Sequence, residues 1–140
     1  VNVLVYAHNA GVAEHPAARR WWEVTVNGAE PVGIDWAVAL GFVRLMSNPR
    51  VAARPQPPEA LLQRIAAILA APQVHLVTPG ICHAVRMREL FEHSGAGFRM
   101  TTDVHLAALC LELGATLATN DADFARFSGL RIVNPLQPQS

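Results

Sequence analysis

The chain has 140 residues, 51% of them hydrophobic, which is enough to bury the core of one domain of ordinary size. Its formal net charge is zero, so no overall basic field is present to attract nucleic acid. No apolar run approaches the roughly 20 residues of a membrane-spanning helix, and no charged and apolar leader opens the sequence. We therefore expect one soluble, cytoplasmic domain that covers residues 1–140.

Predicted helices and strands alternate along the chain. Residues 1–7 are apolar and form either a strand or the first turns of a buried helix, because so short a run has no diagnostic periodicity. Apolar side chains at helical spacing predict helices at 15–26, 36–46, 58–71, 81–93 and 102–113. Apolar runs bounded by turn residues predict strands at 31–34, 74–77, 115–118 and 130–133. This alternation predicts an α/β fold with a small parallel sheet flanked by helices on both faces.

Two tryptophans, Trp21 and Trp22, are adjacent in the predicted helix 15–26. Neighbours on a helix point about 100° apart, so the two side chains cannot share one face. Either both pack on the core through different neighbours, or one of them contacts a partner protein or a second copy of the chain. A homodimer face or a bound amphipathic helix is compatible with the second arrangement.

Several helix ends carry residues suited to capping. Asp35 precedes a strongly apolar helix and is expected to cap it. Thr101 or Thr102 is a suitable cap for the helix 102–113, and Gly114 is expected to end that helix with a positive φ. The buried face of this helix is expected to contain Leu106, Leu109, Cys110 and Leu113.

Three carboxylates lie at the ends of the last predicted elements. Asp103 falls in the first turn of its helix, where the helix dipole stabilises a negative charge. Asp121 and Asp123 follow the strand 115–118, on a turn that leads into a short helical segment, 122–127. Ligands of open α/β sheets bind beyond the carboxyl ends of the strands. The helix start and the strand end can therefore converge on one small acidic volume.

Two interpretations of this acidic cluster remain open on spacing alone. Clustered carboxylates raise one another's pKa unless a cation lies among them, and oxygen-only ligands suit Mg²⁺ or Mn²⁺. Alternatively, the residues are structural: Asp103 caps its helix, Asp121 forms an Asx-turn and Asp123 is solvated.

Motifs across nearly the whole chain bear on this choice. They are VNVLVYA at 1–7 with Asn2 and Leu4, Phe42 and Arg44 followed by SNPRV, TTDVHLAALCLELGA at 101–115 with Asp103, and LATNDADF at 117–124 with Thr119, Asn120, Asp121 and Phe124. Together they resemble the PIN-domain ribonucleases, and among them the VapC-type toxins of bacterial toxin–antitoxin pairs. The resemblance favours the metal-site interpretation.

The resemblance implies a PIN-like domain that acts as a metal-dependent endoribonuclease on structured RNA, with Mg²⁺ or Mn²⁺ as its cofactor. It also implies a cognate VapB-type antitoxin that holds the enzyme inactive. By analogy with the family, Asp103 and Asp121 would be the catalytic metal ligands. Asp123 matches an acidic position found in many members and has a weaker claim to coordination.

Polar and basic residues around these carboxylates would have supporting roles in the family pattern. Asn2, Thr119 and Asn120 would orient the carboxylates or a bound water. Arg44 and Arg99 are candidates for contact with the RNA backbone. All 11 basic residues of the chain are arginines, whose guanidinium groups suit bidentate contact with phosphate.

The sequence departs from the family pattern at two positions. The family's first aspartate stands immediately before the residue matched by Val1, so we expect the reading frame to continue upstream. The family's glutamate on the third helix aligns with Gly41. Without these two groups roughly half of the negative charge of a hard-cation site is missing. The alternative function is therefore a catalytically weak or inactive PIN-fold module that binds RNA or a protein without cutting.

Overall fold

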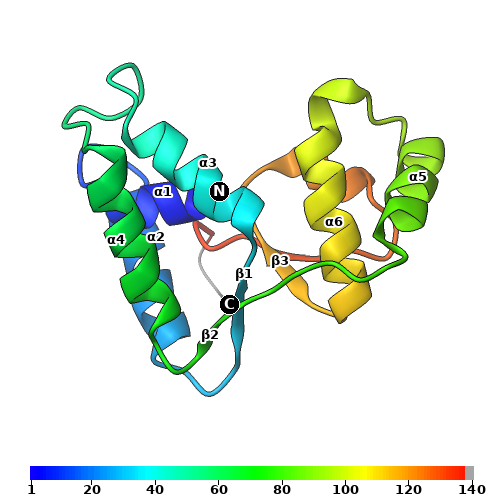
Figure 1. The fold of residues 1–140 in the computed structure, drawn as a ribbon, viewed down its shortest axis with the longest axis horizontal. Helices are drawn as coiled ribbons and strands as arrows, with labels where there is room; N and C mark the ends of the chain where they lie inside the picture. The colour runs from blue at the N-terminus through cyan, green and yellow to red at the C-terminus, as the bar shows by residue number, and fades with distance from the viewer. Residues whose placement is uncertain (138–140) are drawn as a thin grey trace. The chain divides into compact units, whose positions relative to one another are not determined.

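The structure, a computed structural model, describes residues 1–137 of the chain. Contacts between residues divide the chain into two compact units (Figure 1). The N-terminal unit is Val1–Val77 together with the tail from Pro135, and the C-terminal unit is Thr78–Asn134. Within residues 1–137, no helix has both the length and the apolar character that a membrane crossing requires.

The N-terminal unit contains four helices and one parallel strand pair. Its elements are α1 (Asn2–His8), α2 (His15–Val26), β1 (Val32–Ile34), α3 (Trp36–Met46), α4 (Pro58–Leu69) and β2 (Val74–Leu76). Strands β1 and β2 pair in parallel with Val32 opposite Val74. The N-terminal residues, whose periodicity was ambiguous, form the helix α1. The other predicted helices and strands of this unit are confirmed within a few residues.

The C-terminal unit contains two helices and a second parallel strand pair. Its elements are α5 (His83–Ser94), the 3₁₀ segment η1 (Phe98–Met100), α6 (Thr101–Leu113), β3 (Thr116–Ala118), the 3₁₀ segment η2 (Ala122–Arg126) and β4 (Arg131–Val133). Strands β3 and β4 pair in parallel with Thr116 opposite Arg131. The predicted α/β class with parallel strands is therefore confirmed.

Apolar side chains from all four helices form the core of the N-terminal unit. Phe42 and Leu61 are completely buried at its centre. Asp35 caps α3 as expected, because its Oδ2 accepts a hydrogen bond from Ala37 N at 2.9 Å. Trp22 is buried in this core and Trp21 packs against it partly exposed, so both tryptophans contribute to core packing.

Leu61 and Leu62 are neighbours on α4 and differ in burial. Comparing a variant at each position tests how much packing in this core contributes to stability. Leu61 has no exposed surface, whereas Leu62 is 45% exposed. Leu61→Ala should lower the free energy of unfolding by about 2–5 kcal/mol, because it leaves a cavity among packed side chains. Leu62→Ala should change it by about 0.5 kcal/mol. Urea unfolding of both variants measures the difference, and equal losses would show that the core lies elsewhere.

A polar network connects α5 to α6. None of the residues of α5 is buried, although the helix lies beside α6 (Figure 1). His83 Nδ1 lies 3.0 Å from Glu112 Oε2, and His83 Nε2 lies 2.8 Å from His105 Nδ1. The two imidazole rings contact edge to face, with centroids 4.8 Å apart. These contacts attach the start of α5 to α6 where apolar burial is small.

Removal of this network should loosen α5 selectively. His83→Ala breaks both hydrogen bonds and leaves Glu112 and His105 without that partner, so amide hydrogen exchange in α5 should accelerate. His93→Ala is the control, since His93 is exposed on the same helix and bonds only to the carbonyl of Glu89. Exchange measured by mass spectrometry would contradict this role if both variants behaved alike.

Candidate active site

The first turn of α6 carries Asp103. The helix begins at Thr101, and the Thr101 hydroxyl donates a hydrogen bond to the Phe98 carbonyl at 2.5 Å. The prediction that Thr101 or Thr102 caps α6 is therefore wrong, because η1 runs directly into the helix and engages the hydroxyl. At the other end Gly114 has φ 62°, as expected of a residue that ends a helix.

The buried side of α6 fixes the orientation of Asp103. Its buried residues are Val104, Leu106, Ala107, Ala108 and Leu109. Leu113, expected on the same face, is 50% exposed because the last turn of the helix projects beyond the packed region. The helix is thus anchored mainly through its first half, directly after the turn that carries Asp103.

The end of β3 holds the second carboxylate through a chain of hydrogen bonds. Thr119 is buried, and its N–H donates to the Val133 carbonyl at 3.0 Å, which extends the pairing with β4. Its hydroxyl oxygen accepts from the N–H of Asp121 at 3.1 Å. Asp121 Oδ1 in turn accepts from the N–H of Asp123 at 2.9 Å and begins η2. This is the Asx-turn of the structural interpretation, and it leaves Asp121 Oδ2 outside the turn.

The third carboxylate, that of Asp123, lies near Arg126 of the same turn. Asp123 Oδ1 lies 3.9 Å from Arg126 Nη2, and Arg126 Nε donates to the Asp123 carbonyl at 3.2 Å. The Asp123 side chain is 66% exposed, so this pair contributes little to stability. Arg126 does hold the carboxylate within its own turn.

The negative charges of the other two aspartates act on Asp103. Burial raises the pKa of Asp103, and the negative charges of Asp121 and Asp123 raise it further, with Arg126 acting in the opposite direction. A mutual effect of this kind requires proximity. The structure therefore places Asp121 and Asp123 within electrostatic range of Asp103. Across residues 1–137, however, no three Asp, Glu, His or Cys side chains are grouped closely enough to hold a metal ion between them.

Asn120 adds an oxygen between Thr119 and Asp121. Its Oδ1 is buried and accepts no hydrogen bond from the part of the chain that the structure describes. A buried acceptor without a donor is unfavourable by about 1–3 kcal/mol unless water or a cation approaches it. This amide and the three carboxylates offer only oxygen donors, the ligand type that a hard divalent cation prefers.

Comparison with known proteins shows the family of the chain. The family model described as PIN domain matches residues 1–130. The chain belongs to the PIN-domain family. It is 39% identical to ribonuclease VapC37 of Mycobacterium tuberculosis over 134 residues, which are 96% of this chain and 93% of that protein. It is 41% identical to ribonuclease VapC43 of the same organism over 140 residues, covering 100% of this chain and 95% of the relative. Its resemblance to VapC-type proteins is thus confirmed.

A solved structure supports the fold independently of close sequence similarity. The crystal structure of VapBC2 from Rickettsia felis, bound to a DNA fragment from the promoter, superposes with a TM-score of 0.68 at 18% identity. The match covers 95% of this chain and 93% of that one. At this identity the likeness concerns the PIN fold alone.

The other predicted residues of the PIN-domain site are exposed. Asn2 begins α1 and Arg44 lies in the last turn of α3, both in the N-terminal unit. Arg99 lies in η1, just before α6, and its guanidinium stands 5.7 Å above the ring centroid of Phe98. The cation–π contact positions Arg99 two residues before the helix that carries the first carboxylate.

Gly41, which the resemblance aligns with a glutamate of the family, lies against another residue of the N-terminal unit. Gly41 is buried on α3, and a Cβ atom there would lie 3.0 Å from Val1 Cγ2. Such a contact is tighter than most Cβ atoms make, so a larger residue requires the Val1 side chain to shift by a few tenths of an ångström. The neighbour of Gly41 is therefore the apolar side chain of Val1, and the position itself carries no carboxylate.

Sequence reasoning missed the network formed by His83, His105 and Glu112. The last two residues are seven positions apart and therefore lie on one face of α6, which was the only available signal. Their partner His83 comes from a different helix, 22 residues before His105. No local pattern predicts that pairing.

The raised pKa of Asp103 predicts a pH-dependent loss of stability. The unfolded carboxyl ionises near its ordinary pKa of 3.8, whereas the folded one ionises at higher pH, so the folded state binds more protons between these values. Stability should fall as the pH rises through this window and stay reduced at pH 7. Asp103→Asn removes the effect and should be more stable than wild type at pH 7 in chelator, with an advantage that shrinks toward pH 3.8.

Glu59 offers a matched control for this measurement. It is the acidic residue in the first turn of α4 and is exposed. Glu59→Gln loses only the favourable interaction with the helix dipole and should be slightly less stable than wild type at pH 7. Urea unfolding between pH 4 and 8 compares the variants, and an Asp103→Asn protein that was destabilised at pH 7 would refute the electrostatic argument.

Proposed function

We propose that this protein is a Mg²⁺-dependent endoribonuclease of the VapC type, which cleaves structured RNA and is neutralised by a VapB-type antitoxin. The observation that carries the proposal is the placement of Asp103 in the first turn of α6 and of Asp121 and Asp123 in the turn after β3, where their charges act on Asp103. Asn120, in the same turn, has a buried amide oxygen that accepts no hydrogen bond within residues 1–137. The names of the relatives, ribonucleases that cover nearly the whole chain, support the same activity.

In this proposal Asp103 and Asp121 hold the metal ion, with water completing its shell, and Asp123 supports them from its turn. Two carboxylates with several waters are a common way to bind Mg²⁺, and Mn²⁺ accepts the same ligands. When bound, the ion lowers the pKa of an attacking water and neutralises charge that develops on the phosphate. Thr119 positions the backbone of Asp121 through its hydroxyl oxygen. Asn120 offers its buried oxygen to water.

Contact with RNA would come from individual arginines. The chain has no net charge, so affinity depends on local guanidinium groups and should weaken as the salt concentration rises. Arg99 is the better placed of the predicted contacts, because it is exposed and precedes the helix of Asp103 directly. Arg44 is exposed on α3 and stays a prediction.

The antitoxin and a second copy of the chain are the proposed protein partners. The solved structure with the matching fold is a VapBC2 complex, which supports a VapB-type partner for this chain. Trp36 and Leu40 lie one turn apart on α3 and are 45% and 56% exposed. Adjacent exposed apolar side chains of this size suit a homodimer face. A cytoplasmic location is proposed with these partners.

Cleavage of labelled RNA tests the proposal. With Mg²⁺ the protein should cut structured RNA, and chelator should abolish the reaction. Asp103→Ala and Asp121→Ala should each reduce the rate by about 100-fold or more, because each removes charge stabilisation at the reacting phosphate. Glu59→Ala should cut at the wild-type rate. Equal cleavage by Asp103→Ala and wild type would remove the assignment.

The second candidate function is a PIN-fold module that binds RNA or a protein without cutting. The pairing of Gly41 with Val1 favours it, since a carboxylate is absent where the family pattern has one. Calorimetry separates the two functions. Uptake of Mg²⁺ that Asp103→Ala abolishes supports the nuclease, whereas RNA binding without metal uptake or cleavage supports the module.

A further inference from the structure

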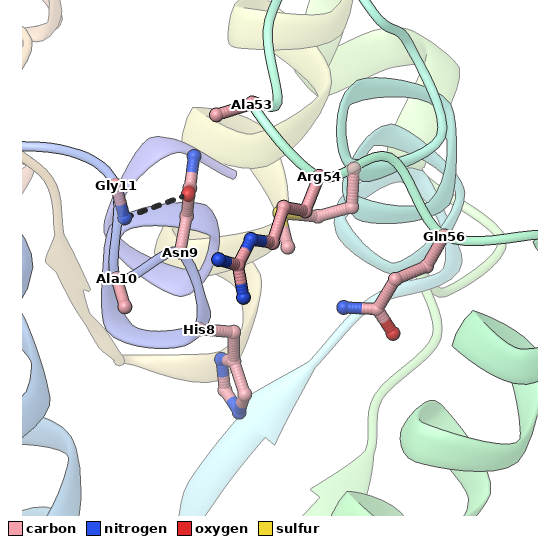
Figure 2. A pocket seen from close by; sticks show the side chains of 8 residues that line it. His8, Asn9, Ala10, Gly11, Ala53, Arg54 and Gln56 are labelled. Carbon is pink, nitrogen blue, oxygen red and sulfur yellow. Dashed lines mark hydrogen bonds between the residues drawn. The ribbon is translucent and has the colours of Figure 1, made fainter.

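The N-terminal unit contains a cavity of about 460 Å³ between the end of α1 and the loop that follows α3 (Figure 2). Its volume falls within the range of about 300–1,000 Å³ that is typical of sites for small organic ligands. The cavity is lined by His8, Asn9, Ala10, Gly11, Met46, Ala53, Arg54 and Gln56. None of these residues is acidic.

The cation of the cavity is Arg54. Its side chain extends from the loop toward the end of α1, as Figure 2 shows. Within residues 1–137 its guanidinium makes no hydrogen bond or ion pair. Five N–H donors are thus available to a ligand in the fork geometry that suits phosphate and carboxylate oxygens.

Two amides add neutral donors. Asn9 is 8% exposed, and its Oδ1 accepts a hydrogen bond from Gly11 N at 3.2 Å. This contact fixes the amide so that Nδ2 remains available as a donor. Gln56 is anchored by its N–H, which donates to the Met46 carbonyl at 3.2 Å. Its side-chain amide extends into the space beside Arg54 (Figure 2).

The electrostatic surroundings of the cavity are positive, although the chain as a whole is neutral. The pKa of His8 is lowered chiefly by burial, against the effect of its hydrogen bond to the Leu4 carbonyl. The positive charges of Arg64 and Arg19 lower it further. Two arginines outside the cavity therefore act on a residue that lines it. An anion in this place would meet attraction from several directions.

We propose that this cavity binds the phosphate group of a nucleotide, with Arg54 as the charged contact and with Asn9 and Gln56 as amide donors. The donor set without a carboxylate selects an anion, and the volume admits more than a bare phosphate ion. A compact cavity fits one nucleotide better than an extended acidic peptide. That this nucleotide belongs to an RNA strand rests on the proposed function, whereas recognition of the phosphate does not.

Binding measured in chelator tests the inference apart from catalysis. The probes are adenosine 5′-monophosphate by calorimetry and a short labelled oligoribonucleotide by fluorescence anisotropy, with inorganic phosphate as competitor. Arg54→Ala removes the charged contact. Arg50→Ala is the matched control, because Arg50 is an exposed arginine of the same loop that does not line the cavity. Gln56→Ala provides a second, milder variant.

Arg54→Ala should weaken binding of both probes about 10- to 100-fold, since a hydrogen-bonded charge is lost. Arg50→Ala should weaken it less than about threefold. Gln56→Ala should fall between them, and inorganic phosphate should displace both probes. Equal binding by Arg54→Ala and Arg50→Ala, or probes that phosphate fails to displace, would overturn the inference. So would a glutamate-rich peptide that bound as tightly and depended equally on Arg54.

The same experiment separates this inference from the proposed nuclease activity. Glu59→Ala, which changes an exposed residue outside the cavity and the aspartate site, should bind both probes like wild type. Arg54-dependent binding in a protein that cuts no RNA would contradict the nuclease proposal alone. Binding of the mononucleotide without the oligoribonucleotide would overturn the assignment to a strand.

Discussion

The candidate site depends on the hydrogen-bond chain that runs from Thr119 through Asp121 to Asp123. The pairing of β3 with β4 places Thr119, and Thr119 then directs the backbone of Asp121. The Asx-turn completes the chain and consumes one oxygen of Asp121. Burial raises the pKa of Asp103, and the negative charges of these two neighbours raise it further. Like charges gathered in this way destabilise a fold unless a cation compensates them, which is the physical basis of the proposed metal dependence.

The structural and the functional interpretations of the aspartates are therefore not exclusive. Asp121 forms the turn that the structural interpretation requires, and Asp123 is solvated and paired with its neighbour Arg126. Asp103 differs, because it caps no helix and its side chain makes no hydrogen bond within residues 1–137. Within its own unit its charge is favoured by the helix start and by Arg126 and opposed by burial and by two aspartates. It is the residue on which the functional argument rests most heavily.

The chain has no net charge, but its charged residues are distributed unevenly. The acidic cluster belongs to the C-terminal unit, and the cavity of Arg54 with its cationic surroundings belongs to the N-terminal unit. The net charge excluded only an overall basic field that would attract nucleic acid. It gave no information about the acidic cluster or about the cavity of Arg54. Local fields of opposite sign allow each unit to attract a different ligand. Polar groups also determine helix packing, since the network of His83 attaches α5, which has no buried residues, to α6.

Much of the fold was predictable from local pattern, because helical spacing and turn residues depend on neighbours in the sequence. The helices after the first, the parallel strands, the cap at Asp35 and the positive φ of Gly114 all follow from such patterns. The aspartates were also singled out by their places at element ends. Tertiary structure decided the helical state of α1, the packing of both tryptophans, the exposure of Leu113 and the loss of the Thr101 cap. It also created the Arg54 cavity and the histidine network, whose members come from separate elements. Distance in sequence carries no information on such contacts, since only the folded chain brings those side chains within reach of one another.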